Sequence, residues 1–453
     1  MRLNRFLYKS YRFFYRIEVW RARRHTMSGI TATIILVPVA VLGMDTHRSL
    51  IYQTFCLLSA IVLLAFLWSQ LHRFRGRLKI IRKLPQYATV GQPFVYTICF
   101  DNCSAKPQVG LQFYEDVIDP RPSMHELLNS REPGEERRNI WDRKVLYYRW
   151  LWLVSRKRKI DDRLHAIPDL GGDGRAEVRI EAVPKSRGNL HLTGVTIARL
   201  DPIGLFRSLT SIPVSQKMVI LPKRYSLPPI LLPGHRKYHA GGVKMAASIG
   251  NFEDFISLRD YRPGDSMRHI HWKSSAKKNK LIIKEFQDEY FVRHALILDT
   301  FYNITHSDRF EEAVSIAASL VCSLQAQESL LDLIFVGDQA YRFSTGRGMA
   351  SYETILELLA SVDVCTHKPF DTIGAPVFDH LDLFSGCICV LLAWDEARKD
   401  FVERLKRRGV PLMVIVVLDD TPASDEQVES MEEGEADFFV VKVGRVQEGL
   451  SRL

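Results

Sequence analysis

The sequence predicts a multi-domain protein in which an N-terminal transmembrane α-hairpin is followed by a β-sandwich-like domain and a C-terminal doubly wound α/β domain. Three observations predict this fold class. Two long apolar runs lie near the N-terminus, short runs of alternating apolar residues follow them, and strand-like and helix-like segments alternate over the last third of the chain. The chain has 453 residues, 46% of them hydrophobic, so it is long enough for roughly two or three folded domains.

The two apolar runs, residues 27–44 and 50–71, each approach the roughly 20 residues that a helix needs to cross a hydrocarbon core. The loop between them is too short for anything but a hairpin, so both outer ends lie on the same side. Lys and Arg side chains are concentrated in residues 1–26 and again in residues 73–83. By the positive-inside rule, both termini and the soluble domains lie in the cytoplasm. We therefore expect a multi-pass protein of the plasma (inner) membrane, with membrane lipid as one partner.

A cleaved signal peptide is the competing interpretation of the first run. Its basic region would be unusually long, no A-x-A site follows the run, and the second run would still anchor the chain. The seven cysteines include no C-x-x-C pair, which fits a reducing compartment and indicates that they are packing residues.

The β-rich domain is expected over residues 85–232. Apolar residues alternate in Phe94–Phe100 and Leu190–Ile197, which predicts a small antiparallel sandwich. A charged insertion, residues 121–169, interrupts this pattern and contains an aromatic run at 145–154 with four basic residues after it. One interpretation is an interfacial segment with its aromatics among lipid headgroups and its bases on anionic lipid. The other is a hydrophobic strand or helix of the β domain with a solvated basic tail.

The C-terminal domain, residues 291–453, alternates strand and helix patterns. The predicted elements are a strand at His294–Asp299, a helix at Asp308–Gln327, a strand at Leu331–Val336, a helix at Tyr352–Leu359, a strand at Cys387–Ala393, a helix at Glu396–Arg408, a strand at Leu412–Leu418 and a last strand at Phe438–Val443. This alternation predicts a parallel sheet covered on both faces, in which ligands bind at the carboxyl ends of the strands.

Between these domains lies a charged and aromatic segment, residues 233–290, which we call the signature segment. Its acidic and basic residues interleave, which indicates a paired surface more than a patch of one sign. The run Arg262–Asp265 reads Arg-Pro-Gly-Asp and predicts a turn that folds the flanking pieces back on each other.

The signature segment resembles domain of unknown function family fifty-eight. The residues that carry the resemblance are Phe252, Leu258–Asp265, Ile270–Ala276 and Lys284–Phe286. Asp201–Phe206, which reads DPIGLF, resembles the family's DPFGLF run with Ile203 in place of Phe. The resemblance implies a membrane-anchored protein whose C-terminal domain is von Willebrand A-like and which works with a MoxR-type AAA+ ATPase.

The same resemblance implies a candidate magnesium site. Von Willebrand A domains carry D-x-S-x-S after the first strand, and here Asp299 begins a run in which both serine positions have changed, to Phe301 and Asn303. Asp299, Thr345 and Asp395 are the remaining candidate ligands, and Mg²⁺ prefers such oxygen donors. The alternative is that Asp299 caps the following turn or helix and Asp395 caps the helix after it.

Other chemistry has less support. His235 and His239 have the i,i+4 spacing of zinc ligands, but the neighbouring Gly241-Gly242 argues against a helix there. Ser274 and Ser275 lack the G-x-S-x-G context of a hydrolase, and the sequence has no P-loop, so we expect no enzyme. Basic residues among aromatics can bind single-stranded nucleic acid, yet the interleaved acids would repel phosphate, so we expect no nucleic-acid partner.

The sequence therefore favours a membrane-anchored, non-catalytic adaptor or scaffold without a cofactor, which recruits a MoxR-type AAA+ ATPase or a client protein. The residues expected at that contact, or as its support, are Arg259, Asp260, Arg262, Asp265, His271, Trp272 and Lys273. A second interpretation is that these residues lock the β domain to the α/β domain. The alternative function is a Mg-dependent von Willebrand A-type receptor with a degenerate metal site.

Overall fold

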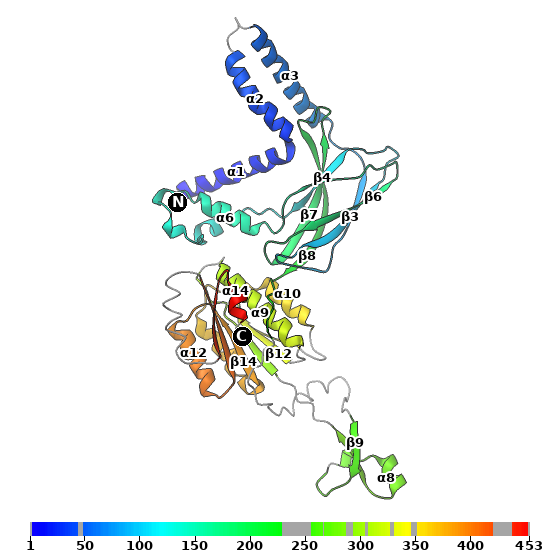
Figure 1. The fold of residues 1–453 in the computed structure, drawn as a ribbon, viewed down its shortest axis with the longest axis vertical. Helices are drawn as coiled ribbons and strands as arrows, with labels where there is room; N and C mark the ends of the chain where they lie inside the picture. The colour runs from blue at the N-terminus through cyan, green and yellow to red at the C-terminus, as the bar shows by residue number, and fades with distance from the viewer. Residues whose placement is uncertain are drawn as a thin grey trace. The chain divides into compact units, whose positions relative to one another are not determined.

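The computed structural model describes residues 2–43, 49–228, 255–265, 267–286, 293–303, 307–326, 330–345, 351–419 and 437–451 (Figure 1). These residues form two compact units. The first consists mainly of the chain up to Arg224 and also takes in Ser307 and Leu356–Val362. The second consists of the other described residues from Tyr225 onward. The predicted His235 and His239 lie outside the described residues.

Three helices open the first unit: α1 (Arg2–Arg24), α2 (Met27–Gly43) and α3 (Ser49–Leu71). The predicted pair of apolar helices is confirmed, and α2 packs along α3. Among the described helices, α3 alone is both long and apolar enough to cross a membrane, while the apolar part of α2 is shorter. The two-span topology therefore stays a prediction.

The β-rich part of the first unit consists of two sheets. One has the order β1-β3-β6 and the other β2-β8-β7-β4-β5. Their bounds are β1 (Leu78–Lys83), β2 (Tyr87–Thr89), β3 (Phe94–Asn102), β4 (Leu111–Val117), β5 (Leu164–Ala166), β6 (Arg175–Ala182), β7 (Gly188–Leu200) and β8 (Arg207–Leu221). Both sheets contribute to one buried apolar cluster, in which Ile98 and Phe100 of β3 join Phe113, Ile197 and Ile220. All pairings are antiparallel except that of β2 with β8.

The insertion between β4 and β5 is helical. It contains α4 (Met124–Asn129), the 3-10 helix η1 (Glu135–Arg137), α5 (Ile140–Val145) and α6 (Tyr147–Lys157). The aromatic run at 145–154 lies mostly in α6, which buries Trp150, Leu153 and Val154. Side chains of α1 pack against this cluster, so the partner of the buried face is α1, which neither interpretation of the sequence had foreseen.

The second unit contains a six-stranded sheet of order β13-β12-β11-β14-β15-β16. The strands are β11 (Arg293–Leu298), β12 (Leu330–Val336), β13 (Ala340–Thr345), β14 (Gly386–Leu391), β15 (Leu412–Leu418) and β16 (Phe438–Lys442), and all are parallel except the edge strand β13. The helices of this part of the chain are α9 (Asp308–Ala326), α10 (Tyr352–Ser361), η3 (Phe370–Ile373), α11 (Gly374–Phe378), η4 (Leu381–Leu383), α12 (Glu396–Arg407) and α14 (Val446–Leu450).

Both faces of this sheet are covered. Ala295 and Ile297 of β11 pack in one cluster with Phe401 of α12, and α9 contacts the same strand as well as β12 and β14. Because neighbouring residues of a strand face opposite sides, this accounts for strands that read as continuous apolar runs. Each predicted strand and helix of this domain is present, with ends that differ by at most two residues. The edge strand β13 was not predicted.

The described part of the signature segment folds as an antiparallel hairpin with two short helices. β9 (Phe255–Asp260) pairs with β10 (Ile282–Phe286), and η2 (Met267–His269) and α8 (Trp272–Lys278) lie between them in the chain. The structure thus confirms that the pieces on either side of the Arg262–Asp265 turn fold back on each other.

Candidate functional site

The turn of the signature segment is fixed by Asp265. Its two carboxylate oxygens accept hydrogen bonds from Nη1 and Nη2 of Arg259 at 2.7 and 2.8 Å, and Oδ2 also accepts from the backbone N–H of Arg262 at 2.8 Å. Gly264 has a φ of 107°, a conformation that side chains disfavour. The hydrogen bonds from Arg259 and from the backbone of Arg262 lower the pKa of Asp265 to about 2. Arg259 and Asp265 therefore hold the turn in shape.

The start of α8 is tied to β10. His271 donates its backbone N–H to the carbonyl of Ile282 at 2.8 Å, and its Nδ1 lies 2.7 Å from Oγ of Ser274. Oγ of Ser275, which is buried, accepts from the backbone N–H of Ile282 at 2.9 Å. The His-Trp-Lys-Ser-Ser run thus supplies three polar residues that fix the helix against the strand, and both serines have structural partners.

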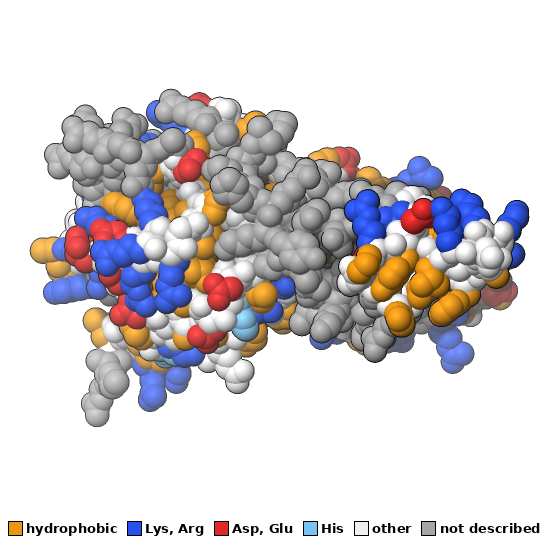
Figure 2. Space-filling model, turned by 90° about the horizontal axis from the view of Figure 1, so that it is seen from below, with side chains coloured by type: hydrophobic (Ala, Val, Ile, Leu, Met, Phe, Trp, Pro, Cys, Tyr) orange, Lys and Arg blue, Asp and Glu red, His pale blue; other side chains and the backbone are white. Residues whose placement is uncertain are grey.

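Two residues of the same run face outward. The Trp272 side chain is 68% exposed, although a tryptophan is usually largely buried, and Lys273 beside it is exposed too. Asp260 is exposed and pairs with Lys280 at 2.6 Å. Figure 2 shows hydrophobic side chains side by side on this part of the molecule, bordered by Lys and Arg. The exposed large hydrophobic residues here are Leu258, Met267, Trp272 and Leu281.

The seven predicted site residues therefore divide into two groups. Arg259, Asp265 and His271 build the framework, and the side chains of Asp260, Arg262, Trp272 and Lys273 are exposed. The second group is the more exposed, since the side chains of Arg259 and Asp265 are only 32% and 20% exposed. Met267, which is 70% exposed, also belongs with the second group, although it was not predicted from the sequence. It fits no apolar periodicity, and this could have indicated that its side chain is exposed.

At the carboxyl end of β11, Asp299 is completely buried and its carboxylate is fully engaged. Oδ1 accepts from the backbone N–H of Phe301 at 2.9 Å, and Oδ2 accepts from the N–H of Leu392 at 2.9 Å and from Nε of Arg398 at 2.6 Å. Strand order reverses between β11 and β14, so this is the edge at which doubly wound folds bind ligands.

Arg398 also holds the second aspartate. Its Nη1 donates to Oδ2 of Asp395 at 2.6 Å, its Nη2 donates to the carbonyl of Phe301 at 2.9 Å, and its guanidinium lies 4.7 Å from the centre of the Phe370 ring. Burial works against the charge, but the carboxylates of Asp299 and Asp395 outweigh it and raise the pKa of Arg398. The guanidinium thus lies between the two candidate metal ligands.

Asp395 is the N-cap of α12, because its Oδ1 accepts from the backbone N–H of Arg398 at 3.0 Å. The capping alternative is therefore what the structure shows for Asp395, and Asp299 likewise accepts from the turn that follows it. Sequence reasoning missed Arg398. The available signal was an arginine on the same helical face as Phe401, Val402 and Leu405, which are buried.

Thr345 does not join the two aspartates. Thr345 of β13 pairs with Leu331 of β12, and Leu331 pairs with His294 of β11. His294 is at the amino end of β11, about 16 Å along the strand from Asp299, so Thr345 lies at the other end of the strands. Within the described residues there is no group of three or more His, Cys, Asp or Glu residues that could hold a metal. The predicted magnesium ligands are therefore not brought together, and the donors that are present do not fit the ion, because Arg398 already occupies the carboxylates.

The DPIGLF loop, Asp201–Phe206, lies at the base of the apolar helix pair. The Asp201 carboxylate accepts the backbone N–H groups of the four residues from Ile203 to Phe206, at 2.5 to 3.2 Å, which makes the loop rigid. Thr26, just before α2, donates its hydroxyl to the Gly204 carbonyl at 2.7 Å and its N–H to the Leu205 carbonyl at 3.1 Å. This motif therefore joins the sandwich to the helix pair.

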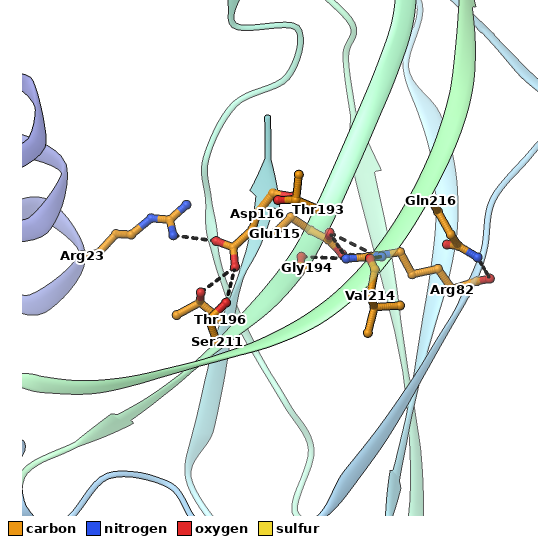
Figure 3. A network of polar contacts seen from close by, with 10 residues as sticks. All are labelled: Arg23, Arg82, Glu115, Asp116, Thr193, Gly194, Thr196, Ser211, Val214 and Gln216. Atoms are coloured by element: carbon orange, nitrogen blue, oxygen red, sulfur yellow. Dashed lines mark hydrogen bonds and ion pairs between the residues drawn. The ribbon is translucent and has the colours of Figure 1, made fainter. Parts of the chain in front are cut away.

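A polar network links the two sheets of the sandwich to each other and to α1 (Figure 3). Arg82 of β1 crosses between the sheets: its Nε lies 3.2 Å from both oxygens of Glu115, and its other nitrogens donate to the carbonyls of Gly194 and Val214. The next residue of β4, Asp116, faces the other way and accepts from Nη1 of Arg23 in α1 at 2.6 Å. Burial raises the pKa of Glu115 to about 7, although Arg82 opposes the shift.

Residues 257–383 match a family described as "Protein of unknown function DUF58". The match confirms the predicted resemblance for the motifs from Leu258 to Phe286 and supplies no activity. Phe252 and the DPIGLF run lie outside the matched residues. The "Uncharacterized protein YeaD" of Bacillus subtilis (strain 168) is 26% identical over 178 residues, which are 38% of this chain and 42% of YeaD. The chain thus spans less than half of the length of this relative.

Two solved structures are similar to parts of the chain. The CARDB domain of the PF1109 protein from Pyrococcus furiosus covers 33% of this chain and 92% of that domain, with 10% identity and a TM-score of 0.17. A GH20 exo β-N-acetylglucosaminidase from Vibrio harveyi covers 80% of this chain and 61% of that enzyme, with 11% identity and a TM-score of 0.13. TM-scores this low carry no argument about fold or function.

Proposed function

We propose that this chain is a membrane-anchored, non-catalytic adaptor whose signature segment recruits a MoxR-type AAA+ ATPase or its client protein at the cytoplasmic face of the membrane. The observation that carries the proposal is the exposed Trp272 on a helix that is held firmly in place. Tryptophan is enriched among the residues that dominate binding energy at protein interfaces. A side chain on a framework that is already ordered loses less conformational entropy on binding.

The charge around Trp272 indicates the kind of partner. Lys273, Lys277 and Lys278 of the same segment are all exposed, and the acids Asp260 and Asp265 already pair with Lys280 and Arg259. In the part of this segment that the structure describes, the charge left for a partner is therefore mainly positive. Complementary charge gives orientation and fast association more than affinity, which suits reversible recruitment of an acidic surface.

The proposal includes an anchor and a second folded unit. Helices α2 and α3 form the transmembrane hairpin, and the shorter α2 can be accommodated by local thinning of the bilayer. The α/β domain with its buried Asp299 and Arg398 is taken as a von Willebrand A-like fold in which an internal arginine replaces the metal. Its role in the adaptor is structural support or a second contact surface.

The test is binding of a purified MoxR-type ATPase to the full chain in nanodiscs, with ATP and with ADP. We expect the double variant Trp272→Ala, Lys273→Glu to lose at least about tenfold in affinity. Replacing an interface tryptophan with alanine often costs about 2 kcal/mol or more of binding free energy. The matched control is Trp141→Ala with Lys144→Glu, which changes another exposed tryptophan and lysine on the short helix α5.

Equal weakening of binding by both double variants would contradict the proposal, and so would unchanged binding by both. The charge exchange of Arg262 with Asp265 is a poorer test, because Asp265 holds the turn and its loss would disturb the whole segment. The Trp272 and Lys273 changes leave these hydrogen bonds in place.

A further inference from the structure

Helix α1 has two different faces. Tyr8, Tyr11 and Tyr15 lie on one face and pack against Trp150 and its neighbours in the insertion, where the hydroxyl of Tyr11 donates to the carbonyl of Val145 at 2.8 Å. The opposite face carries large apolar side chains that are exposed in the structure: Leu3, Phe6, Phe13, Phe14 and Ile17. Their spacing places them on one side of a helix of 3.6 residues per turn.

The exposed apolar stripe is too large to be ordinary surface. Phe6 is 67% exposed and Phe14 is 64% exposed, and five such side chains follow one another over about four turns of the helix. Contiguous exposed apolar patches of this kind mark contact sites for a membrane or another protein. A partner is therefore needed for this face.

Charge identifies that partner. Arg5, Lys9, Arg12 and Arg16 recur at spacings of three and four residues and are all exposed, so they form a row along one border of the stripe. The helix has no acidic residue in its first turn. A row of bases beside a stripe of Phe, Leu and Ile is the composition of helices that lie in the interface of an anionic bilayer.

The position of α1 in the fold supports the same partner. The helix ends at Arg24 and α2 begins at Met27, so α1 leads directly into the apolar helix pair. In Figure 1, α6 lies on one side of α1, and α2 and α3 extend away from its other side. The exposed stripe, which is opposite the tyrosines, therefore faces the surface of the bilayer that the pair is proposed to cross. A soluble protein partner would have to fit between α1 and that surface.

We propose that α1 is an amphipathic helix that lies flat in the headgroup region of an anionic membrane, with Leu3, Phe6, Phe13, Phe14 and Ile17 inserted and Arg5, Lys9, Arg12 and Arg16 on lipid phosphates. The inference rests on the proposed membrane anchor and is independent of the proposed ATPase contact. It gives α1 a second task, because Arg23 at its end bonds to Asp116 of the sandwich and to Asp162 at 2.9 Å. In this proposal α1 lies between the bilayer and the sandwich and contacts both.

The experiment measures local depth in the full chain reconstituted in vesicles of neutral and of anionic lipid. Single cysteines replace Phe6 or Phe13 in a background without the exposed Cys56 and Cys103, and each carries a fluorophore that is quenched by lipids with a spin label high in the acyl chain. Ala22→Cys, on the tyrosine side of the same helix, is the matched control, and a chain that keeps only Cys56 in α3 marks full insertion.

In anionic vesicles we expect probes at positions 6 and 13 to lose at least about half of their emission, to similar extents because the helix lies flat, and the probe at position 22 to lose little. Replacing Arg5, Lys9, Arg12 and Arg16 with Gln should reduce this loss and remove its dependence on anionic lipid. Unquenched probes at 6 and 13 beside a quenched probe at Cys56 would overturn the proposal. So would self-quenching between labelled copies without quenching by lipid, since that shows a second copy on the stripe.

Discussion

Arg398 donates a hydrogen bond from Nε to Oδ2 of Asp299 at 2.6 Å, at the edge of the α/β sheet where strand order reverses. The same guanidinium holds Asp395, so the chain supplies its own cation to the two carboxylates that a metal-dependent receptor would need for its ion. The receptor hypothesis and the adaptor hypothesis therefore make different predictions about Arg398.

Arg398→Ala should destabilise the α/β domain by about 3 to 5 kcal/mol, because removing one partner leaves the buried carboxylate of Asp299 without its counter-charge. The measurement is urea unfolding of the detergent-solubilised chain. Arg407→Ala is the control, since Arg407 is exposed on the same helix and pairs with Glu403 at the surface, and it should cost less than about 1 kcal/mol. Equal costs for the two variants would show that the buried bridge contributes nothing.

Magnesium should separate the two functional hypotheses. We expect millimolar Mg²⁺ to leave the melting temperature of the wild type unchanged and to raise that of Arg398→Ala, because Asp299 and Asp395 then lack a cation. Calcium and a monovalent salt of equal ionic strength are the controls for a screening effect. A rise in the wild type that Asp299→Asn abolishes would restore the metal-dependent receptor and contradict our assignment of Arg398.

The stability of the sandwich should depend on the titration of Glu115. Its pKa of about 7 lies above the value of about 4.3 in an unfolded chain, so the folded state binds this proton more tightly. That contribution to the free energy of unfolding is fully present below pH 4 or so and is lost as the pH rises through about 7. Arg82, Asp116 and Tyr96 are the charged and titratable groups that act on Glu115 and on its surroundings.

Glu115→Gln removes this titration while it keeps a side chain of the same shape. From pH 5 to pH 8 we expect the melting temperature of the wild type to fall relative to that of the variant. Glu181→Gln, which changes an exposed glutamate of β6, is the matched control. A constant difference between the wild type and Glu115→Gln over this range would show that Glu115 does not change its charge there.

Gly29→Ala should weaken the joint between the sandwich and the helix pair. A Cβ at Gly29 would lie 2.1 Å from the carbonyl oxygen of Leu205, so the DPIGLF loop would have to move. We expect a cost on the order of 2 kcal/mol and faster proteolysis at the loop. Ser28→Ala, at an exposed neighbouring position of the same helix, should behave like the wild type. Unchanged proteolysis of Gly29→Ala would mean that the close approach is not maintained in solution.

The α/β domain was largely predictable from the sequence because its strands are buried on both faces. β14 and β15 are continuous apolar runs, and α9 carries its apolar residues at helical spacing, so the pattern defines each element and nearly its ends. The edge strand β13 was missed for the opposite reason. Its residues are mostly half-buried, so Ala340–Thr345 lacks the apolar run of its neighbours. Because this strand was not predicted, Thr345 was expected near Asp299, whereas it lies at the other end of the parallel strands.

The candidate site was predictable only in part. The residues of the signature segment are close in the sequence, so a single motif identified both the framework and Trp272. The bridge from Arg398 to Asp299 joins residues 99 positions apart, and nothing local marks an arginine as the partner of a distant aspartate. The contact of α1 with the insertion is similar, because Tyr11 and Val145 are 134 positions apart. Such pairs are set by tertiary packing, on which periodicity gives no information.

Glu115 and Asp116 of β4 help to fix the alignment of this strand with its neighbours. A slip of β4 by one position that brought Asp116 to the place of Glu115 would give Arg82 a shorter carboxylate and would leave Val117 in place of Asp116 opposite Arg23. Apolar side chains tolerate such an error more readily than a buried ion pair does. Two arginines on opposite faces of β4 thus favour the observed register over its neighbours, and the ion pair of Arg23 with Asp116 ties the docking of α1 to that register.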